Sequence, residues 1–207
     1  MALFTEIGSD MLNEFAHPYS SNPLAAHDVR LIDAKTPAQL AAAAELMRAF
    51  VSWQHVRHAE HRERIDAYFD PDGFDDELAR LPEPYEHPGG ALLLAKVGSD
   101  FAGCIALKPL GDGACEMKRL YLKPEYHGLG IGRRLVSRLI EEATAIGYTM
   151  MRLETGPLQL EAQALYADFG FRRILPYRSL PDCLRDWVIC MERPLTATPR
   201  LSATASA

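Results

Sequence analysis

Three glycines stand at alternate positions in the middle of the chain, directly before a segment with the hydrophobic pattern of a helix. They are Gly128, Gly130 and Gly132, and apolar residues then recur at helical spacing as far as Ile146. Glycine has no Cβ, so the backbone of such a loop can come close to a ligand. The first turn of a helix also presents unpaired N–H groups and a partial positive charge. Together these features predict a site for an anion, most often a phosphate.

The glycine loop lies between two predicted strands, at residues 114–122 and 148–155, and Gly147 closes the intervening helix as a left-handed C-cap. A strand, a loop, a helix and a second strand form a right-handed crossover, whose two strands are parallel. Strands predicted at 91–97 and 101–107 precede this unit as an antiparallel meander. Where the antiparallel half of the sheet meets the parallel half, we expect the strands to splay and leave a cleft.

The other segments complete a mixed α/β pattern. Thr36 and Gln39 form a capping box around Pro37, which predicts the start of a helix. That helix has an apolar face through Val51 and continues as a polar helical region up to Phe69. Further elements are expected as strands at 29–33, 171–174 and 187–192 and as helices at 74–81 and 160–169. We expect one domain, residues 29–195, between a poorly ordered N-terminal extension at 1–28 and a disordered tail at 196–207.

Composition and charge exclude several functions. The chain has 207 residues and a formal net charge of −6, so it lacks the basic footprint of a nucleic-acid-binding protein. It has no run of about 18 apolar residues that would span a membrane. Its N-terminus carries acidic residues where a signal peptide would need positive charge. The four cysteines show no CxxC spacing and are typical of a reduced, cytoplasmic protein.

Two nucleotide-binding motifs can be compared with the glycine loop. A P-loop requires lysine and then serine or threonine after its last glycine, whereas Gly132 is followed by Arg133 and Arg134. A dinucleotide-binding fingerprint requires GxGxxG close to the strand and an acidic residue about 20 positions later. Glu154 stands at a suitable distance, but the spacing here is GxGxG, and the preceding antiparallel meander does not belong to that fold.

A third interpretation rests on resemblance to a family. His127-Gly128-Leu129-Gly130-Ile131-Gly132 resembles the [Q/R]xxGx[G/A] signature of the GNAT superfamily of acetyl-CoA-dependent N-acetyltransferases. Residues 116–122, Glu-Met-Lys-Arg-Leu-Tyr-Leu, are similar to the fourth strand of that family. Leu165-Tyr166 followed by Gly170-Phe171 resembles the family's last motif, LYxxxGF. The chain departs from the signature at His127, which is mostly neutral at pH 7 where arginine or glutamine is usual.

The resemblance implies a fold, a cofactor and a set of binding residues. The fold is an α+β, GNAT-like one: a twisted, mixed, mostly antiparallel sheet with a β-loop-α-β cofactor unit and helices on both faces. Acetyl-CoA is the implied co-substrate, with its pyrophosphate on the loop and its pantetheine arm between the splayed strands. The implied cofactor-binding residues are Leu120, Tyr121, Leu122, His127, Gly128, Leu129, Gly130, Ile131, Gly132 and Arg133. Arg134 could add further charge.

The same resemblance implies direct attack of an amine on the thioester, whose carbonyl a backbone N–H of the fourth strand would polarise. An amine with a pKa near 10.4 arrives protonated and needs a base. Glu116 is the candidate base and Glu154 the second candidate, although Glu116 could equally be a solvated or ion-paired strand residue. Tyr166 matches the family's tyrosine that protonates the leaving thiolate; the alternative is a core tyrosine packed with Leu165 and Phe169.

The acceptor is expected to be the primary amine of a small molecule, entering past the wall formed by residues 53–87. Glu77, Tyr85 and Tyr177 could contact it, but each is more simply interpreted as an ordinary surface or packing residue. His55, His58 and His61 recur every three residues, but that spacing turns around a helix and arginines flank it, so we expect an exposed polar face and no metal site.

The alternative function is a non-catalytic, coenzyme A-binding sensor or scaffold. Members of this family often form homodimers, and the sequence shows no interface. Trp53 and Trp187 are interpreted as core aromatics.

Overall fold

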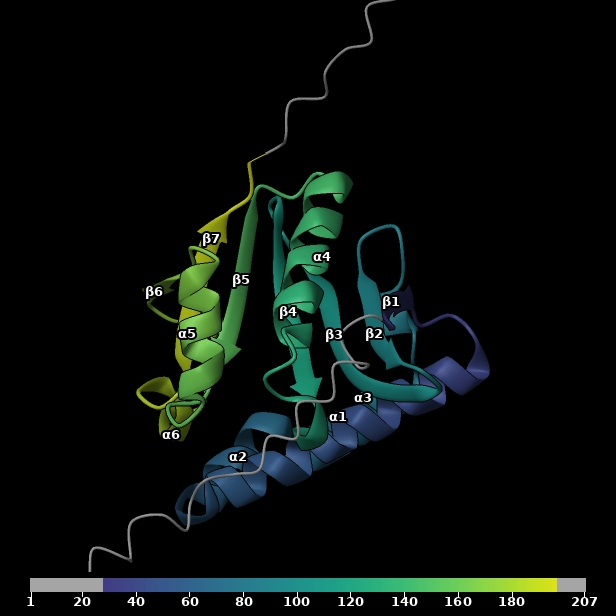
Figure 1. Cartoon of the computed structure of the whole chain (residues 1–207). Coiled ribbons are helices and arrows are strands. Elements are labelled where there is room, and N and C mark those ends of the chain that lie inside the picture. Colours follow the sequence, from purple (N-terminus) through teal and green to yellow (C-terminus); the bar gives the residue numbers. More distant parts are fainter. Residues whose placement is uncertain (1–27, 197–207) are drawn as a thin grey trace, which may run out of the picture.

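The central element of the fold is one seven-stranded sheet in the order β1-β2-β3-β4-β5-β7-β6 (Figure 1). The computed structural model describes residues 28–196, so the expectations for both ends of the chain fall outside it, apart from Asp28 and Thr196. The strands are β1 (Val29–Asp33), β2 (Ala91–Val97), β3 (Asp100–Gly111), β4 (Ala114–Leu122), β5 (Met150–Thr155), β6 (Arg172–Ile174) and β7 (Ile189–Pro194). The helices are α1 (Pro37–Arg57), α2 (Arg62–Phe69), α3 (Pro71–Ala79), α4 (Ile131–Ile146), α5 (Leu160–Asp168) and α6 (Asp182–Arg185).

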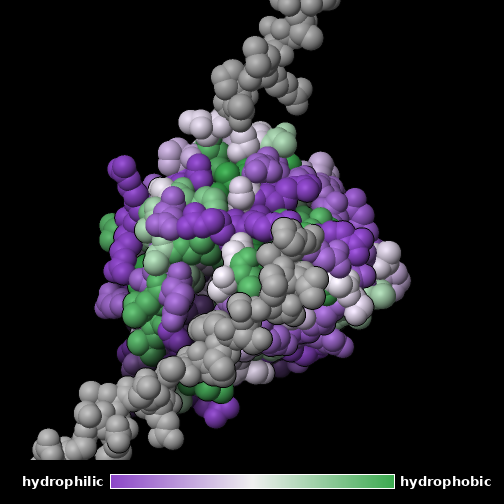
Figure 2. Space-filling view, in the orientation of Figure 1, coloured by the Kyte–Doolittle hydropathy of each residue, from purple (hydrophilic) through white to green (hydrophobic). Residues whose placement is uncertain are grey.

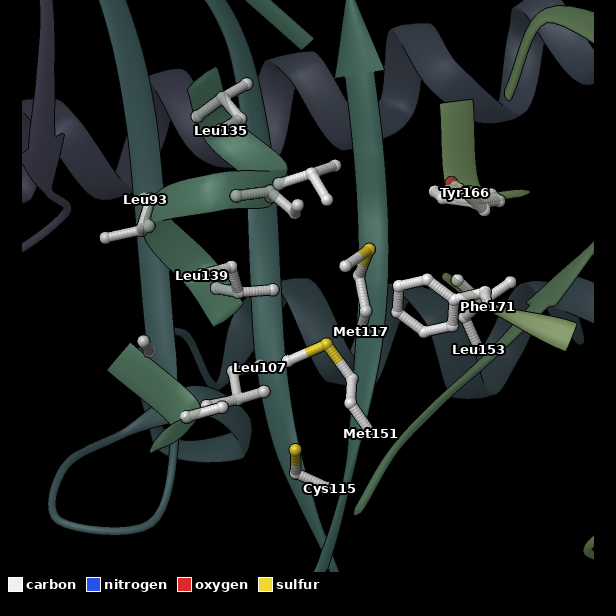
Figure 3. Close-up of a cluster of buried hydrophobic side chains, with 14 of the residues drawn as sticks. Leu93, Leu107, Cys115, Met117, Leu135, Leu139, Met151, Leu153, Tyr166 and Phe171 are labelled. Carbon is white, nitrogen blue, oxygen red and sulfur yellow. The ribbon is translucent and has the colours of Figure 1, made fainter. Parts of the chain in front are cut away.

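Helices cover both faces of the sheet, each over its own hydrophobic core. On one face, α4 and α5 enclose a core that includes Met117, Leu135, Leu139, Leu153 and Phe171 (Figure 3). On the other face, α1, α2, α3 and α6 enclose a second core that includes Met47, Ile65, Phe74, Leu94 and Leu184. This arrangement confirms the expected α+β fold with helices on both faces.

The pairing of the strands follows the expected pattern. β1, β2, β3 and β4 form an antiparallel meander, β4 and β5 are parallel, and β5, β7 and β6 are antiparallel. The parallel pair is the one connected through the glycine loop and α4. The β-loop-α-β unit predicted from the sequence is therefore confirmed.

The sheet opens between β4 and β5. Their register runs from Ala114↔Met150 only to Met117↔Leu153, although both strands continue further. β3, in contrast, stays paired with β4 as far as Gly103↔Leu122. The far half of β4 thus has a partner on one side only, and the expected splay is present at the place where the two kinds of pairing meet.

A bulge in β4 accompanies this opening. The register between β3 and β4 shifts between Cys104 and Ala106, and Arg119 has a φ of 57° there. A positive φ is unusual for a residue with a side chain and persists only where the surroundings enforce it. The Arg119 guanidinium donates to both carboxylate oxygens of Glu77, at 2.9 and 2.6 Å, and lies over the rings of Phe69 and Phe74. These contacts hold the bulge against α2 and α3.

Local signals place the ends of the two longest helices. At the start of α1, the Gln39 N–H donates to Thr36 Oγ1 at 3.3 Å and the Thr36 N–H donates to Gln39 Oε1 at 2.9 Å, which confirms the capping box. At the end of α4, Gly147 has a φ of 104° and donates to helix carbonyls, which confirms the left-handed C-cap.

Other boundaries differ from the sequence expectations. The polar helical region expected after Val51 and up to Phe69 is divided between the end of α1, a short 3-10 turn and α2. α3 begins at Pro71 rather than at residue 74, because the fixed φ of proline suits the first position of a helix. α6 was not expected, since one turn is too short to show a hydrophobic period, and it delays the start of β7 to Ile189.

Candidate active site

The glycine loop joins the end of β4 to the start of α4. Gly128 and Gly130 have φ values of 76° and 72°, which explains the need for glycine at both positions. Gly130 is the N-cap of α4 and no side chain caps this helix, so its first N–H groups lack side-chain acceptors. A Cβ added to Gly130 would find no protein atom within 4 Å. The loop is therefore an open, electropositive cradle that fits the diphosphate of a nucleotide cofactor.

The other loop residues expected to bind the cofactor have distinct surroundings. His127 donates from Nε2 to the carbonyl oxygen of Leu122 at 3.0 Å, which ties the loop to the end of β4. Leu129 is partly exposed, whereas Ile131 is buried in the core beneath α4, so only its backbone is available. Gly132 lies against Leu122, and a Cβ there would come within 3.3 Å of the leucine Cδ1.

The two arginines at the start of α4 are engaged with protein groups. Arg133 forms an ion pair with Asp168 of α5 and lies over the ring of Phe169. Arg134 donates to the backbone carbonyl of Val29 at 2.8 Å. In this structure, the charge available to an anion comes from the helix terminus more than from these side chains.

A pocket lies where β4 and β5 separate, and it contains about 700 Å³ of space that is partly open to solvent. Figure 2 shows the surface hollowed between the α4 side and the α5 side in the orientation of Figure 1. Leu120, Glu116 and Tyr166 line the pocket, as does Glu154. Tyr121 instead faces the second core, where its ring lies 5.9 Å from that of Phe50. The pocket thus joins the predicted catalytic residues to the part of β4 expected beside the cofactor arm.

Glu116 is buried at the pocket wall and has two close polar partners. The hydroxyl of Tyr177 donates to its Oε1 at 2.7 Å, and Lys118 Nζ lies 3.4 Å from its Oε2. Burial lowers the pKa of Lys118, although the neighbouring carboxylates oppose this effect. Glu116 therefore has one oxygen in a hydrogen bond and the other in a longer ion pair.

Glu154 is held much more firmly. The Arg178 guanidinium donates to both of its carboxylate oxygens at 2.7 Å, and the Tyr68 hydroxyl donates to Oε2 at 2.9 Å. Its side chain is 1% exposed. Because a two-pronged arginine contact is among the strongest a carboxylate makes, Glu154 has little capacity left to accept a proton from a substrate.

Tyr166 projects from α5 into the pocket wall. Its ring packs edge-on against Phe171, with 5.9 Å between the centroids (Figure 3). Burial raises the pKa of Tyr166 above its usual value of 10, so its hydroxyl stays protonated at neutral pH and can donate a proton. The residue is both a core tyrosine and a pocket residue, so the two interpretations of its role are compatible.

Three residues considered as possible acceptor contacts have protein partners and lie outside the lining of this pocket. Glu77 accepts from Arg119, and the Tyr85 hydroxyl donates to Glu77 at 2.6 Å. Tyr177 donates to Glu116. Their contacts hold β4, through Arg119, and the side chain of Glu116.

Several pocket residues were missed from the sequence. They are Phe50, Gln54, Tyr68, Lys118, Gln159 and Trp187. Gln54 lies on the buried face of a helix, and Trp187 was interpreted as a core aromatic; it is buried, but it also lines the pocket. No linear pattern identifies these residues, because the fold brings together α1, α2 and the segment before β7.

The three regularly spaced histidines do not form one exposed face, contrary to the expectation. His55 Nε2 lies 2.7 Å from Asp66 Oδ1, His58 is buried, and the His61 ring faces Trp187 at 6.4 Å. Within residues 28–196, no three histidine, cysteine or acidic side chains cluster in a way that could hold a metal ion. None of the helices in that range is long and apolar enough to cross a membrane.

Comparison with known proteins agrees with this geometry. An uncharacterised N-acetyltransferase of Schizosaccharomyces pombe is 43% identical over 109 residues, which are 52% of this chain and 67% of the relative. An acetyltransferase from Streptococcus agalactiae has the same fold, with a TM-score of 0.64 at 21% identity over 82% of this chain and 99% of its own. The PaiA N-acetyltransferase of Thermoplasma acidophilum, solved with coenzyme A, has a TM-score of 0.59 at 22% identity over 80% and 98% of the two chains.

The model of the acetyltransferase (GNAT) family matches residues 45–171, which are more than half of the chain. That range contains the β4 strand, the glycine loop, α4 and Tyr166. The protein therefore belongs to the GNAT family of acetyltransferases, and its class of activity is N-acyl transfer.

Proposed function

We propose that this protein transfers the acetyl group of acetyl-CoA to the primary amine of a small molecule, by direct attack and without an acyl-enzyme. The observation that carries the proposal is the pocket at the β4–β5 opening, because it places Glu116 and Tyr166 in one cavity beside Leu120. Glu116 can accept a proton and Tyr166 can donate one, as acyl transfer from a thioester to an amine requires.

The residues near the loop fit coenzyme A. The uncapped N-terminus of α4 and the backbone at Gly128 and Gly130 would hold its diphosphate, and His127 would keep that loop in place. Beyond Met117, β4 has no pairing with β5, so its backbone groups on that side are available to the pantetheine arm. Bound acetyl-CoA supplies an activated acyl thioester. The coenzyme A found in the Thermoplasma neighbour supports this assignment.

Glu116 is the better base of the two candidates. Its Oε2 has only the longer contact to Lys118, whereas both oxygens of Glu154 are bound by Arg178. Glu116 would take a proton from the ammonium, directly or through a water molecule, and release the lone pair that attacks the carbonyl carbon. In this assignment, Glu154 orients Tyr68 and Arg178 at the acceptor end of the pocket.

Tyr166 is assigned as the acid. Because burial raises the pKa of its phenol, the hydroxyl keeps its proton at neutral pH and is available to donate it to the departing thiolate. Donation from its Oη would then neutralise the leaving group. The enclosed form of the pocket, between two sheet halves and the helices that cover them, supports a small amine as the acceptor. A cytoplasmic location is consistent with the free state of all four cysteines.

A free-thiol assay over a panel of primary amines tests the proposal. We expect acetyl-CoA-dependent turnover with at least one amine, and a fall in kcat of about 10²–10⁴-fold in Tyr166→Phe. Calorimetry should give the same affinity for coenzyme A in this variant. Tyr148→Phe is the matched control, because it removes a hydroxyl that donates to the Gly89 carbonyl outside the pocket. Coenzyme A binding without turnover of any amine would favour a sensor or scaffold instead.

A further inference from the structure

Three buried polar atoms lack a hydrogen-bond partner within residues 28–196. They are Gln54 Oε1, His58 Nε2 and Trp187 Nε1. The three residues are 5%, 1% and 8% exposed. Leaving a buried donor or acceptor without a partner costs about 1–3 kcal/mol, so such atoms are rare and call for an explanation.

The three atoms belong to one region of the structure. Gln54 lies in the last turn of α1 and His58 is the C-cap of that helix, and the rings of His58 and Trp187 meet edge-on with 5.1 Å between centroids. Gln54, Trp187 and Gly156 line the pocket. His58 Nε2 lies 2.9 Å from the position that a Cβ of Gly156 would take, so this nitrogen packs directly against the glycine at the pocket wall. Two of the unpartnered atoms therefore belong to residues that line one end of the pocket, and the third lies immediately behind Gly156.

The hydrogen-bonding capacity of these atoms can be assigned. His58 Nδ1 lies 3.3 Å from the backbone carbonyl of Gln54, and because a carbonyl only accepts, Nδ1 carries the hydrogen. Burial lowers the pKa of His58, with Arg57 and His61 adding to the effect, so the ring is neutral at pH 7 and Nε2 is an acceptor. The indole N–H of Trp187 can only donate. The Gln54 amide can present an oxygen or a nitrogen.

The charged groups around the pocket are already paired. Glu154 binds Arg178 and Glu116 contacts Lys118, while Arg119 behind the wall binds Glu77. A charged substituent on the acceptor would therefore have no unpaired opposite charge among these groups. The end of the pocket at Gln54, His58 and Trp187 offers hydrogen bonds and no charge.

We propose that this end of the pocket binds an uncharged group of the acceptor that both donates and accepts hydrogen bonds, namely a hydroxyl or a carboxamide. A carboxylate has no hydrogen to offer His58 Nε2, an ammonium has no acceptor for the Trp187 N–H, and a hydrocarbon leaves all three atoms unpaired. The inference rests on the proposed function, since it names the substrate class of the same pocket. It assigns Gln54, His58 and Trp187 as specificity residues.

The test is a series of acceptors with one backbone: pentylamine and its derivatives with a terminal hydroxyl, carboxamide, carboxylate or second amine, together with the shorter homologues. At saturating acetyl-CoA, we expect kcat/KM for the hydroxyl or carboxamide compound to exceed that of the alkylamine by at least about tenfold. The kcat/KM values of the carboxylate compound and the diamine should not exceed that of the alkylamine. Whichever of the hydroxyl and carboxamide compounds has the higher kcat/KM identifies the acceptor group that this end of the pocket binds.

Trp187→Phe keeps an aromatic ring and removes the N–H. The preference for the hydroxyl or carboxamide compound over the alkylamine should then fall to within about two- to threefold. Trp53→Phe, in α1 and outside the pocket lining, should retain that preference. Equal turnover of all the amines would overturn the inference, and so would a preference that Trp187→Phe leaves intact; in both cases the proposed function would stand.

Should no amine be turned over, the proposed function fails and calorimetry of the same probes with coenzyme A present decides the inference. Tighter binding of the hydroxyl or carboxamide probe that is lost in Trp187→Phe supports it. Absence of binding by every probe overturns it.

Discussion

His127 holds the glycine loop through one side-chain hydrogen bond. Its Nε2 donates to the Leu122 carbonyl at 3.0 Å and so connects the glycine loop to the last residue of β4. The sequence indicated that a neutral histidine would contribute less charge here than an arginine, while backbone N–H groups supply most of the binding. The hydrogen bond leads us to propose a positioning role for His127, which a glutamine side chain could also fill because its amide N–H₂ can donate.

We therefore expect His127→Ala to weaken coenzyme A binding by about two- to tenfold, the range of one hydrogen bond, and His127→Gln to keep most of the affinity. Calorimetry with coenzyme A measures both. KM for the acceptor amine should change little, since the loop lies at the other end of the cofactor site. Equal weakening in the two variants would mean that the imidazole acts through something other than this donor.

The site residues that could be identified from the sequence are those that lie within local motifs. Glu116 was identified from the strand before the glycine loop and Tyr166 from the LYxxxGF motif in α5, and both line the pocket. Gln54, His58 and Trp187 were not identified as site residues, because their significance lies in what they fail to contact. An unpartnered atom has no signature in sequence and becomes visible only when every neighbour is placed.

At the scale of elements, the most consequential contact is the one between α3 and β4. Arg119 of the bulge and Glu77 of α3 are separated by 42 positions and form a buried ion pair, with the Tyr85 hydroxyl donating to the same carboxylate. Burial disfavours the Glu77 carboxylate, but the guanidinium and this hydroxyl outweigh it and hold the pKa of Glu77 below its usual value. The pair keeps the bulge facing the second core.

Glu77→Gln should therefore destabilise the protein by about 3–5 kcal/mol, because it leaves the Arg119 charge buried and uncompensated. Urea unfolding measures the change. Glu83→Gln is the matched control: its pair with Arg80, at 3.5 Å, is exposed, and the expected loss is below about 1 kcal/mol. A double variant, Glu77→Leu with Arg119→Met, should recover part of the stability. Similar small losses in both single variants would contradict this role for the pair.

Elements with local signals were also the ones predicted well. α4 has an apolar face and a terminal Gly147, and β1, β2 and β4 have the bounds expected from the sequence. The bulge at Arg119 and the single turn of α6 depend on contacts made across the fold, and neither was predicted. The splay of β4 from β5 was expected in general terms, whereas the residue at which pairing stops, Met117, required the structure.

For the whole molecule, the opening divides the sheet into two halves. One half consists of β1–β4 and the other of β5–β7. The two halves are joined only by the pairing of β4 with β5, from Ala114↔Met150 to Met117↔Leu153. Beyond that point, Arg57 of α1 spans the opening by donating to Glu161 of α5 and to the Leu158 carbonyl. A ligand seated between the halves would replace the missing strand contacts. Its binding energy would then add to the stability of the fold.

Coenzyme A at about one hundred times its Kd should stabilise the folded protein by about 2.7 kcal/mol and raise Tm by several degrees. Amide hydrogen exchange locates the effect: protection should increase in β4 beyond Met117 and at the start of α4, where amides gain a ligand partner. The pairs of β1 with β2, from Val29↔Val97 to Asp33↔Leu93, are already complete and should change little, which makes them the internal control. If protection increased only in the β1–β2 pair, or if coenzyme A left Tm unchanged, the cofactor would not bind in the opening. Equal protection everywhere would point to global stabilisation, without the local closure expected from a ligand between the two halves.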